Sequence, residues 1–276
     1  MSLIAQIQKR LAVSPCVLVR VHATRGSVPR EAGTWMAVFT DALVGTIGGG
    51  RLELDAIAHA RQRLAMALTD GKAQRPEPER VLYRLGPSLG QCCGGEVQLQ
   101  YEVVQPSHAA EVCQSLATVT TPLALFGGGH VGRALVHVLF TLPMHITWVD
   151  SRDEIFPETV PDNVQCEHSD PVQAAVPVLA AGSRVLIMSF SHAEDLDIVA
   201  SCLLRQRERG DVPYIGLIGS KTKWASFRTR LRERGFSDAE LNHVTCPIGI
   251  SGITDKRPEA IAISVAAQLL LLQNSE

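Results

Sequence analysis

A glycine-rich turn between an apolar segment and a helix-forming segment constrains the fold of this chain more than any other feature. Residues 122–126 are mostly apolar, residues 127–132 carry glycine in the spacing G-x-G-x-x-G, and an amphipathic segment follows. A second apolar segment, 145–149, ends at Asp150. A strand, this glycine spacing, a helix, a second strand and a terminal acid in this order predict a Rossmann-type fold.

Each residue of the motif has a physical task in such a fold. Gly127 permits the tight turn, Gly129 lets the backbone approach a pyrophosphate, and Gly132 allows the helix to pack closely on the strand. The amino end of the helix adds unpaired N–H groups and a partial positive charge. Asp150 would accept hydrogen bonds from ribose hydroxyls, which favours NAD(H), whereas Arg152 could instead meet a phosphate and leaves NADP open. A Rossmann-type fold that has lost its nucleotide is the alternative, because a fold does not determine function.

The rest of the second half has the alternation that a parallel sheet requires. Short, wholly apolar segments are separated by helix-forming segments. The apolar segments are 123–126, 146–149, 185–190 and 214–218. The expected helices are 131–142, 196–207, 221–234 and 258–272. This alternation predicts a doubly wound parallel sheet that helices cover on both faces.

The first half has a different pattern. Three segments alternate apolar and polar side chains, as half-buried strands do. They are residues 16–23, 35–39 and 96–104. Residues 51–68 carry an apolar stripe at helical spacing, and the change between the two patterns falls between 105 and 121. The sequence therefore predicts a strand-rich α+β domain over 1–106, followed by a Rossmann-type domain over 107–276.

Composition and charge exclude several classes of function. The 276 residues have a formal net charge of −2 and only seven Phe, three Trp and three Tyr, whereas nucleic-acid binders show a basic field with stacking rings. The longest apolar run, 260–272, is interrupted by Ser264 and Gln268 and is too short to span a bilayer. Residues 1–11 have helical spacing rather than the pattern of a signal peptide, so we expect a cytoplasmic protein. Seven scattered cysteines without a CxxC pair predict free thiols.

Two loops of the first half combine glycine with features that suit an anion. Residues 23–34 follow a predicted strand and carry Arg25 and Arg30. In the second loop, three consecutive glycines link a strand to a helix; they are Gly48, Gly49 and Gly50. Backbone N–H groups in such a turn are free to face an anion. The alternative is a tight strand-to-helix turn beside arginines that are simply solvated.

A third segment places two adjacent thiols between glycines. Cys92 and Cys93 are flanked by Gly90, Gly94 and Gly95, so little side-chain bulk surrounds them. A thiolate is both a soft-metal ligand and a nucleophile, which makes the pair a candidate metal site. The alternative is that both are small buried residues at the start of a strand. Adjacent strand residues point to opposite faces, so at most one of the two would reach a site.

Several segments of the chain, spread over nearly its whole length, occur together in a specific order. They are residues 23–36, 45–53, 89–95, 125–133, 214–223, 246–250 and 258–264. Taken together they resemble the xanthine dehydrogenase accessory protein family of the XdhC and CoxI type. Residues 251–260 depart from the family's pattern, which usually continues through a glycine-containing turn into Thr-Pro-Glu-Glu.

This resemblance implies a chaperone whose cargo is the molybdenum cofactor. Family members protect the cofactor while a cysteine desulfurase replaces an oxo ligand by sulfur, and they deliver it to apo xanthine dehydrogenase or a related molybdenum hydroxylase. They are commonly homodimers. The loops suit this cargo, because a phosphate-bearing pterin with a soft metal centre requires an anion site and a thiol. Arg25, Arg30 and the glycines at 48–50 would hold the phosphate, and Cys92 or Cys93 would contact the metal.

Two other functions remain open from the residues alone. The first is an NAD(P)-dependent oxidoreductase that uses the glycine motif, with His192 after a predicted strand as its acid or base. The alternative for His192 is an ordinary loop or helix-capping histidine. The second is a redox sensor in which Cys92 and Cys93 change oxidation state, although adjacent cysteines form only a strained disulfide.

Overall fold

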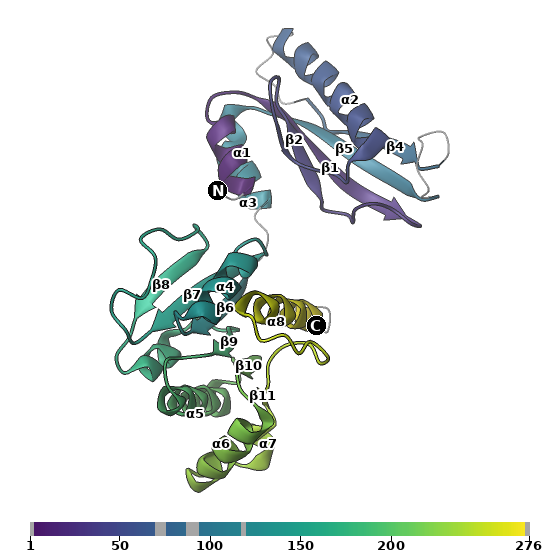
Figure 1. The fold of residues 1–276 in the computed structure, drawn as a ribbon. Helices are drawn as coiled ribbons and strands as arrows, with labels where there is room; N and C mark the ends of the chain where they lie inside the picture. The colour runs from purple at the N-terminus through teal and green to yellow at the C-terminus, as the bar shows by residue number, and fades with distance from the viewer. Residues whose placement is uncertain (1–2, 70–75, 87–93, 117–119, 274–276) are drawn as a thin grey trace. The chain divides into compact units, whose positions relative to one another are not determined.

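The computed structural model describes residues 3–69, 76–86, 94–116 and 120–273. The chain forms two compact units, Met1–Ala117 and Thr118–Glu276, whose ribbons are drawn in Figure 1. Within the described ranges, no helix combines the length and the apolar character that a membrane span requires.

The first unit is built on a five-stranded antiparallel sheet. Its strands are β1 (Cys16–Arg25), β2 (Trp35–Val38), β3 (Leu43–Gly45), β4 (Glu79–Arg84) and β5 (Glu96–Val104). Their order across the sheet is β3-β2-β1-β5-β4, and each neighbouring pair runs antiparallel. The long pair β1 and β5 forms its centre, and both strands lie where the alternating sequences predict strands.

Helices cover both faces of this sheet. The helix α2 (Gly50–Thr69) packs on the face that carries Val17, Val19 and Val21. The opposite face carries Cys16 and Leu18, which pack against α1 (Leu3–Leu11) and α3 (Ala109–Leu116). Successive strand residues point to opposite faces, so β1 contributes to both cores.

The two units divide within the range 105–121, where the sequence pattern changes. The helix α3, which follows a short 3-10 turn (Pro106–His108), buries Val112, Cys113 and Leu116 beside Ile7 and Leu11 of the first unit. The first compact unit therefore extends through α3 to residue 117. The physical reason is that the apolar stripe of α3 completes the core under α1.

The second unit contains a six-stranded parallel sheet. Its strands are β6 (Thr121–Phe126), β7 (Met144–Asp150), β8 (Val164–His168), β9 (Arg184–Ile187), β10 (Tyr214–Leu217) and β11 (Val244–Thr245). The order β11-β10-β9-β6-β7-β8 is that of a Rossmann-type fold. The chain moves outward from β6 to β8 and then returns to β9 on the other side. The carboxyl ends of β6 and β9 are therefore the switch point, the place at which ligands bind in sheets of this kind.

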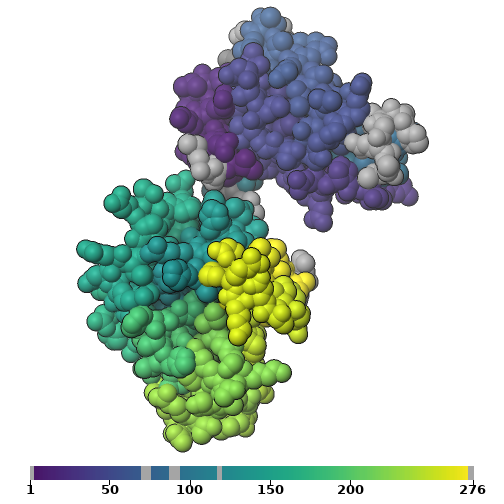
Figure 2. Space-filling view, in the orientation of Figure 1, coloured from purple at the N-terminus to yellow at the C-terminus, as the bar shows by residue number. Residues whose placement is uncertain are grey.

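Helices also cover both faces of the parallel sheet. One face packs on α4 (His130–Leu139) and α8 (Pro258–Gln273), which contribute Leu135 and Leu269 to one core. The other face packs on the 3-10 helix η3 (Val172–Val178), α5 (His192–Arg209) and α6 (Lys221–Glu233), with the short helix α7 (Asp238–Leu241) beside them. The helix α8 also reaches the surface of this unit, as Figure 2 shows, where Ile263 and Leu271 are each 60% exposed.

Candidate functional site

The loop after β1 and the chain that enters β5 lie against each other in the first unit. Arg25, the last residue of β1, is paired with Glu96, the first residue of β5. A Cβ atom on Gly95 would lie 2.7 Å from the carbonyl oxygen of Arg25 and closer still to that of Ser27. Only glycine permits this close approach, since any side chain would collide with backbone. The end of the cysteine-bearing segment is thus fixed beside the loop that carries the arginines.

The glycine turn before α2 packs on the same loop. Gly48 has φ of +119°, and a Cβ atom there would lie 2.9 Å from Cβ of Pro29 and 3.2 Å from Cγ of Arg30. The structure therefore brings together the three loop segments that the sequence analysis singled out. Arg25 and Arg30 are both exposed. Cys92 and Cys93 lie outside the described residues, although Gly94 and Gly95 directly after them belong to this group.

Three amides of the glycine turn, those of Ile47, Gly48 and Gly49, already have partners within the chain. Oε2 of Glu53, in the first turn of α2, accepts hydrogen bonds from the amides of Ile47 (2.9 Å) and Gly49 (3.2 Å). The hydroxyl of Thr46 donates to the same oxygen (2.5 Å) and accepts from the amide of Gly48 (3.1 Å). A carboxylate of the chain itself therefore sits where an external anion was expected. The binding role of Gly48, Gly49 and Gly50 stays a prediction.

Electrostatics agree with a carboxylate held in this turn. Burial by itself would raise the pKa of Glu53, but the hydrogen bonds from Thr46 and from the amides of Ile47, Gly49 and Gly48 outweigh it and leave the pKa below its ordinary value. Glu53 is therefore ionised at neutral pH, and it satisfies N–H groups at the start of α2 that would otherwise lack partners.

A polar network that the sequence analysis missed holds α2 on the sheet. His59 of α2 contacts Oε2 of Glu79 (2.9 Å), and Arg63 donates to the same oxygen. The rings of His59 and Tyr101 meet edge to face at 4.6 Å, and the hydroxyls of Tyr101 and Tyr83 are 2.7 Å apart. The hydrogen bond to His59, followed by that to Arg63, lowers the pKa of Glu79. This network positions the helix whose first turn carries Glu53.

The glycine motif of the second unit has the geometry that its spacing predicts. Gly127 has φ of +125°, and a Cβ atom there would overlap the carbonyl oxygen of Met188. A Cβ atom on Gly132 would overlap the carbonyl oxygen of Gly127, so this glycine permits the contact between α4 and the turn. By contrast, no described atom lies within 4 Å of the position that a Cβ of Gly129 would take. The backbone at Gly129 is therefore open to approach.

Asp150 supports this turn from the end of β7. Its Oδ2 accepts from the amide of Gly128 (2.6 Å), and its two oxygens accept the amide, Nε and Nη2 of Arg152 at 2.8–2.9 Å. Asp150 is only 2% exposed. Burial would raise its pKa, but the bonds from Arg152 and Gly128 hold the pKa below its ordinary value. A ribose hydroxyl would compete with these donors, so ribose binding by Asp150 stays a prediction, as does phosphate binding by Arg152.

Other polar residues at the carboxyl edge were given no role by the sequence analysis. Nζ of Lys223 donates to Oδ2 of Asp195 (2.5 Å) and to the carbonyl of Ile218 (2.9 Å). The amide and hydroxyl of Ser189 donate to the other oxygen of Asp195 at 2.8 and 2.7 Å. This ion pair fastens the loops after β9 and β10 to the first turns of α5 and α6. Ser191 and Ser220 cap the two helices, and capping serines are a sequence signal that could have located these turns.

The cysteine after β11 lies beside this ion pair. A Cβ atom on Gly219 would lie 2.8 Å from Cδ of Lys223 and 3.4 Å from Sγ of Cys246, so both side chains lie beside this glycine. Burial raises the pKa of Cys246 to about 11. The positive charge of Lys223 lowers this pKa, and the negative charge of Asp195 raises it. The thiol is therefore protonated at neutral pH and is a weak metal ligand.

Two polar residues of α8 hold the loop after β11. The amide of Gly249 donates to Oε1 of Gln268, and the amide of Ile250 donates to Oγ of Ser264, both at 2.7 Å. Gln268 also accepts from the hydroxyl of Tyr214 (3.0 Å). The same two residues that interrupt the apolar run of the sequence thus anchor a loop at the edge of the sheet.

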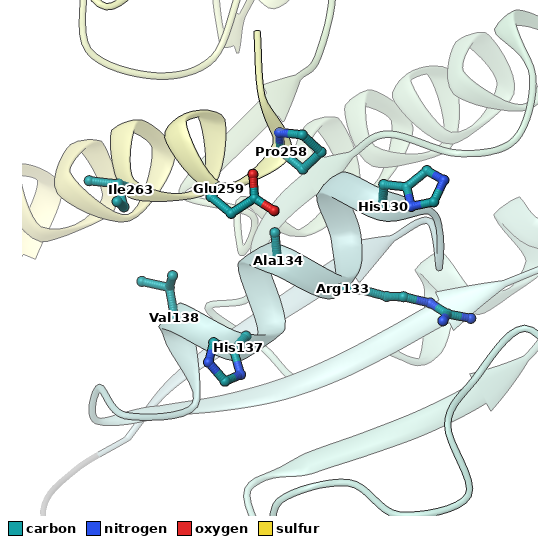
Figure 3. A pocket seen from close by; sticks show the side chains of 8 residues that line it. All are labelled: His130, Arg133, Ala134, His137, Val138, Pro258, Glu259 and Ile263. Carbon is teal, nitrogen blue, oxygen red and sulfur yellow. The ribbon is translucent and has the colours of Figure 1, made fainter. Parts of the chain in front are cut away.

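A groove of about 480 Å³ lies between α4 and α8, and Figure 3 shows it. It is lined by His130, Arg133, Ala134, His137, Val138, Pro258, Glu259 and Ile263. Glu259 of α8 points toward Ala134 of α4 (Figure 3). Arg133 donates to the carbonyls of Ile155 (2.7 Å) and Gly128 (3.3 Å), so its guanidinium braces the glycine turn.

The remaining candidates from the sequence analysis are His192 and the cysteines. His192 is the first residue of α5, is exposed, and meets the ring of Phe227 edge to face at 6.3 Å. Five cysteines are free thiols in the described part of the chain. In that same part, no three His, Cys, Asp or Glu side chains gather closely enough to hold a metal ion. The predicted metal ligands Cys92 and Cys93 lie outside it.

Comparison with known proteins places both units in one family. The model of the XdhC Rossmann domain matches residues 123–269, and that of the XdhC and CoxI family matches residues 10–75. An uncharacterized protein of Escherichia coli (strain K12), YqeB, is 27% identical over 262 residues; these cover 95% of this chain but only 44% of that protein. The chain therefore spans less than half the length of that relative.

A solved structure shares the fold of the whole chain. The crystal structure described as a xanthine dehydrogenase from Bacillus halodurans superposes with a TM-score of 0.79 at 22% identity. The match covers 100% of this chain and 97% of that one. This likeness shows the fold alone. The two family models, which match the glycine turn of the second unit and the loop region of the first, show that the chain belongs to the XdhC and CoxI family.

Proposed function

We propose that this protein takes part in the maturation of a molybdenum hydroxylase such as xanthine dehydrogenase, and that it binds the molybdenum cofactor as its cargo. Membership of the XdhC and CoxI family supports the maturation role. The observation that carries the cargo site is the convergence of three loops in the first unit, where Gly48 contacts the loop of Arg30 and Gly95 contacts that of Arg25.

The residues of these loops fit a phosphate-bearing pterin with a soft metal centre. Arg25 and Arg30 are exposed cations on one loop, and guanidinium groups bind phosphate through paired hydrogen bonds. The amides of the Gly48 turn are engaged by Glu53, so in this proposal the arginines, rather than the amides, hold the phosphate. Cys92 or Cys93 supplies the thiolate for the metal, since thiolates suit soft metal centres.

The proposal extends to the fate of the cargo. The protein shields the bound cofactor, presents it to a cysteine desulfurase that replaces an oxo ligand by sulfur, and hands it to the apo form of the hydroxylase. It acts in the cytoplasm as a homodimer. The resemblance of the loop segments to the family supports these steps, and the exposed position of both arginines is compatible with transfer to a partner.

Metal and pterin analysis of the purified chain tests the cargo site. We expect the chain, expressed in a host that makes the cofactor, to retain molybdenum and pterin. The double variant Cys92→Ala/Cys93→Ala should lose most of the metal, and Arg25→Ala/Arg30→Ala should lose pterin and metal together. Cys166→Ala, a half-buried thiol of the second unit, and Arg61→Ala, an exposed arginine in the middle of α2, serve as matched controls. Full retention by both double variants would refute the site.

An NAD(P)-dependent oxidoreductase is the second candidate function. The open backbone at Gly129 and the close packing at Gly127 and Gly132 favour binding of a dinucleotide. His192, exposed at the start of α5, would be the acid or base. Calorimetry with NADH and NADPH tests binding, and turnover that disappears in His192→Ala tests catalysis. Absence of binding to either nucleotide removes this candidate.

A further inference from the structure

The outer face of α8 carries aliphatic side chains that its own unit leaves exposed. Ile263 and Leu271 are each 60% exposed, and Leu270 is 39% exposed. Figure 2 shows this helix, in yellow, on the surface of the second unit. A single exposed aliphatic side chain is ordinary. These three, however, share one face with Ala260 and Ala267, because residues three, four and seven apart lie on the same side of a helix.

This face carries no charge beyond the first turn of α8. Residues 260–273 contain no Asp, Glu, Lys or Arg, whereas α2, α5 and α6 each carry exposed arginines. A helix that is apolar on all sides is typical of a buried element. The inner side of α8 is buried, through Ala262, Val265 and Leu269, but the second unit does not cover the outer side. The charge pattern therefore suits a partner surface that is equally uncharged, as the centre of a protein interface is.

A groove at the amino end of the same face supplies a place for an aliphatic side chain. It lies between α4 and α8, has a volume of about 480 Å³, and is shown in Figure 3. Ile263 forms part of its wall, together with Ala134 and Val138 of α4. His137 and Glu259 add polar groups of both kinds to the same groove. Aliphatic walls with polar groups beside them match the core and rim of an interface.

The face is self-complementary about Ala267. Ile263 and Leu271 lie four residues to either side of it, which is about 6 Å along the helix axis in each direction. A two-fold axis at Ala267 would set a second α8 antiparallel to the first, with Leu271 of each copy over Ile263 and the groove of the other. The small side chain of Ala267 lets the two helices approach closely at the axis. An isologous interface requires both halves of such a contact on one patch, and this patch carries both.

We infer that the outer face of α8, with the groove beside α4, binds a second copy of this chain about a two-fold axis near Ala267. The inference rests on the homodimer of the proposed function and assigns the surface that forms it. A second copy brings an uncharged stripe for the uncharged stripe and an aliphatic side chain for each groove. The surface lies wholly in the second unit, so it leaves the cargo loops of the first unit outside the interface.

Size-exclusion chromatography with light scattering measures the oligomeric state. We expect the wild type to have the mass of two chains. Ile263→Asp and Leu271→Asp should each raise the dissociation constant of the dimer about a hundredfold or more, because the symmetry places two unpaired carboxylates in the interface. Val178→Asp is the matched control and should keep the wild-type mass, because Val178 is 74% exposed in η3, on the other face of the sheet.

A cross-link tests the position of the axis in a chain that keeps every large side chain of the face. Ala267→Cys places one thiol of each copy at the axis, so a mild oxidant should join most chains into covalent dimers. Ala65→Cys, at an exposed alanine of α2, is the control. It should form no more covalent dimer than the wild type, whose own free cysteines set the background.

The outcomes separate this inference from the proposed function. If neither aspartate variant changes the mass of a dimeric wild type, or if Ala267→Cys cross-links no better than its control, the interface lies elsewhere and only the inference fails. A wild type with the mass of one chain would overturn the inference and the homodimer together, but it would leave the cargo site standing. Molybdenum and pterin retained by the monomeric Ile263→Asp would show that cargo binding does not need the dimer.

Two other occupants of this face are also distinguishable, and either would overturn the inference. If the wild type is monomeric and binds the apo hydroxylase, and Ile263→Asp does not bind it, the face belongs to that partner. If Ile263→Asp instead speeds hydrogen exchange in the first unit of a monomeric chain, the first unit is what covers α8.

Discussion

The two glycine turns of this protein look alike in sequence but differ in chemistry. Each links a strand to a helix, and in each a carboxylate accepts backbone amides. In the first unit, Glu53 of the following helix accepts the amides of Ile47 and Gly49 and closes the turn. In the second, Asp150 of a neighbouring strand accepts one amide of the turn, that of Gly128, and is paired with Arg152. The Cβ position of Gly129 stays open. In this protein, therefore, an acid of the following helix fills the first turn, whereas the acid of the second turn leaves the Cβ position of Gly129 open.

The largest expected effect comes from adding one methyl group to the second turn. Gly132→Ala would place Cβ against the carbonyl oxygen of Gly127, and overpacking against backbone should lower the free energy of unfolding by about 3 kcal/mol or more. Gly129→Ala, the matched control, should change it by less than about 0.5 kcal/mol. Urea unfolding measures both. Equal effects at the two positions would mean that the turn is not packed as described.

Removing the carboxylate of Glu53 should lower the free energy of unfolding and should also free backbone amides of the first glycine turn. Glu53→Ala leaves the amides of Ile47 and Gly49 without their partner, at a cost of about 1–3 kcal/mol. Inorganic phosphate should then raise the melting temperature of the variant but not of the wild type, because the freed amides can bind it. Asp55→Ala, which removes a surface pair with Arg51 in the same helix, is the control. A wild type that responds to phosphate equally would show that Glu53 does not close the turn.

The contribution of Glu53 to the free energy of unfolding should also depend on pH. This change with pH should be smaller than the loss that Glu53→Ala causes. Its folded-state pKa lies below its ordinary value of 4.5, so the stability it contributes is fully present above that value and is lost as the pH falls through the folded-state pKa. The difference in unfolding free energy between wild type and Glu53→Gln should therefore be constant between about pH 7 and about pH 5 and shrink below about pH 4. A difference that grows toward acid would contradict the sign.

The smallest expected effect is that of exchanging one cation for another in the second turn. Arg152→Lys keeps the charge beside Asp150 but loses the paired hydrogen bonds and the flat group over Phe190. We expect a loss of about 1 kcal/mol or less in unfolding free energy, because the side chain is one-third exposed. Thermal unfolding of the variant beside Arg133→Lys, which alters the other arginine at this turn, measures it. A loss as large as that of Gly132→Ala would show that the pair, rather than glycine packing, holds the turn.

Much of the architecture could be predicted from local pattern. The alternation in 16–23 and 96–104 identifies the central strands of the first sheet, and the glycine spacing with its flanking strands identifies the parallel sheet of the second unit. The pattern did not predict β3, β4, β8 or β11, because strands that are short or that carry exposed polar side chains give little periodic signal. It placed the change between the units only within residues 105–121, since the apolar stripe of α3 does not say which core it will complete.

The candidate sites were likewise predicted only in part from the sequence. Residue types and spacing indicated the loops of Arg25, Gly48 and Gly95, and the structure brings them together. Spacing gave no indication that Glu53 would accept hydrogen bonds from amides of the Gly48 turn, or that Lys223 would form an ion pair with Asp195. Such contacts depend on the direction in which a side chain leaves its helix and on what lies opposite.

The sequence by itself determined the kind of fold, the family and the set of loops, because these follow from short-range periodicity and from glycines that only certain turns require. The tertiary structure decided which backbone amides have partners and which remain open, and it set Phe190 over Arg152 at the switch point. These features depend on atoms far apart in the chain that meet only after the sheet has formed, and hydrogen bonding responds to distances of a few tenths of an ångström.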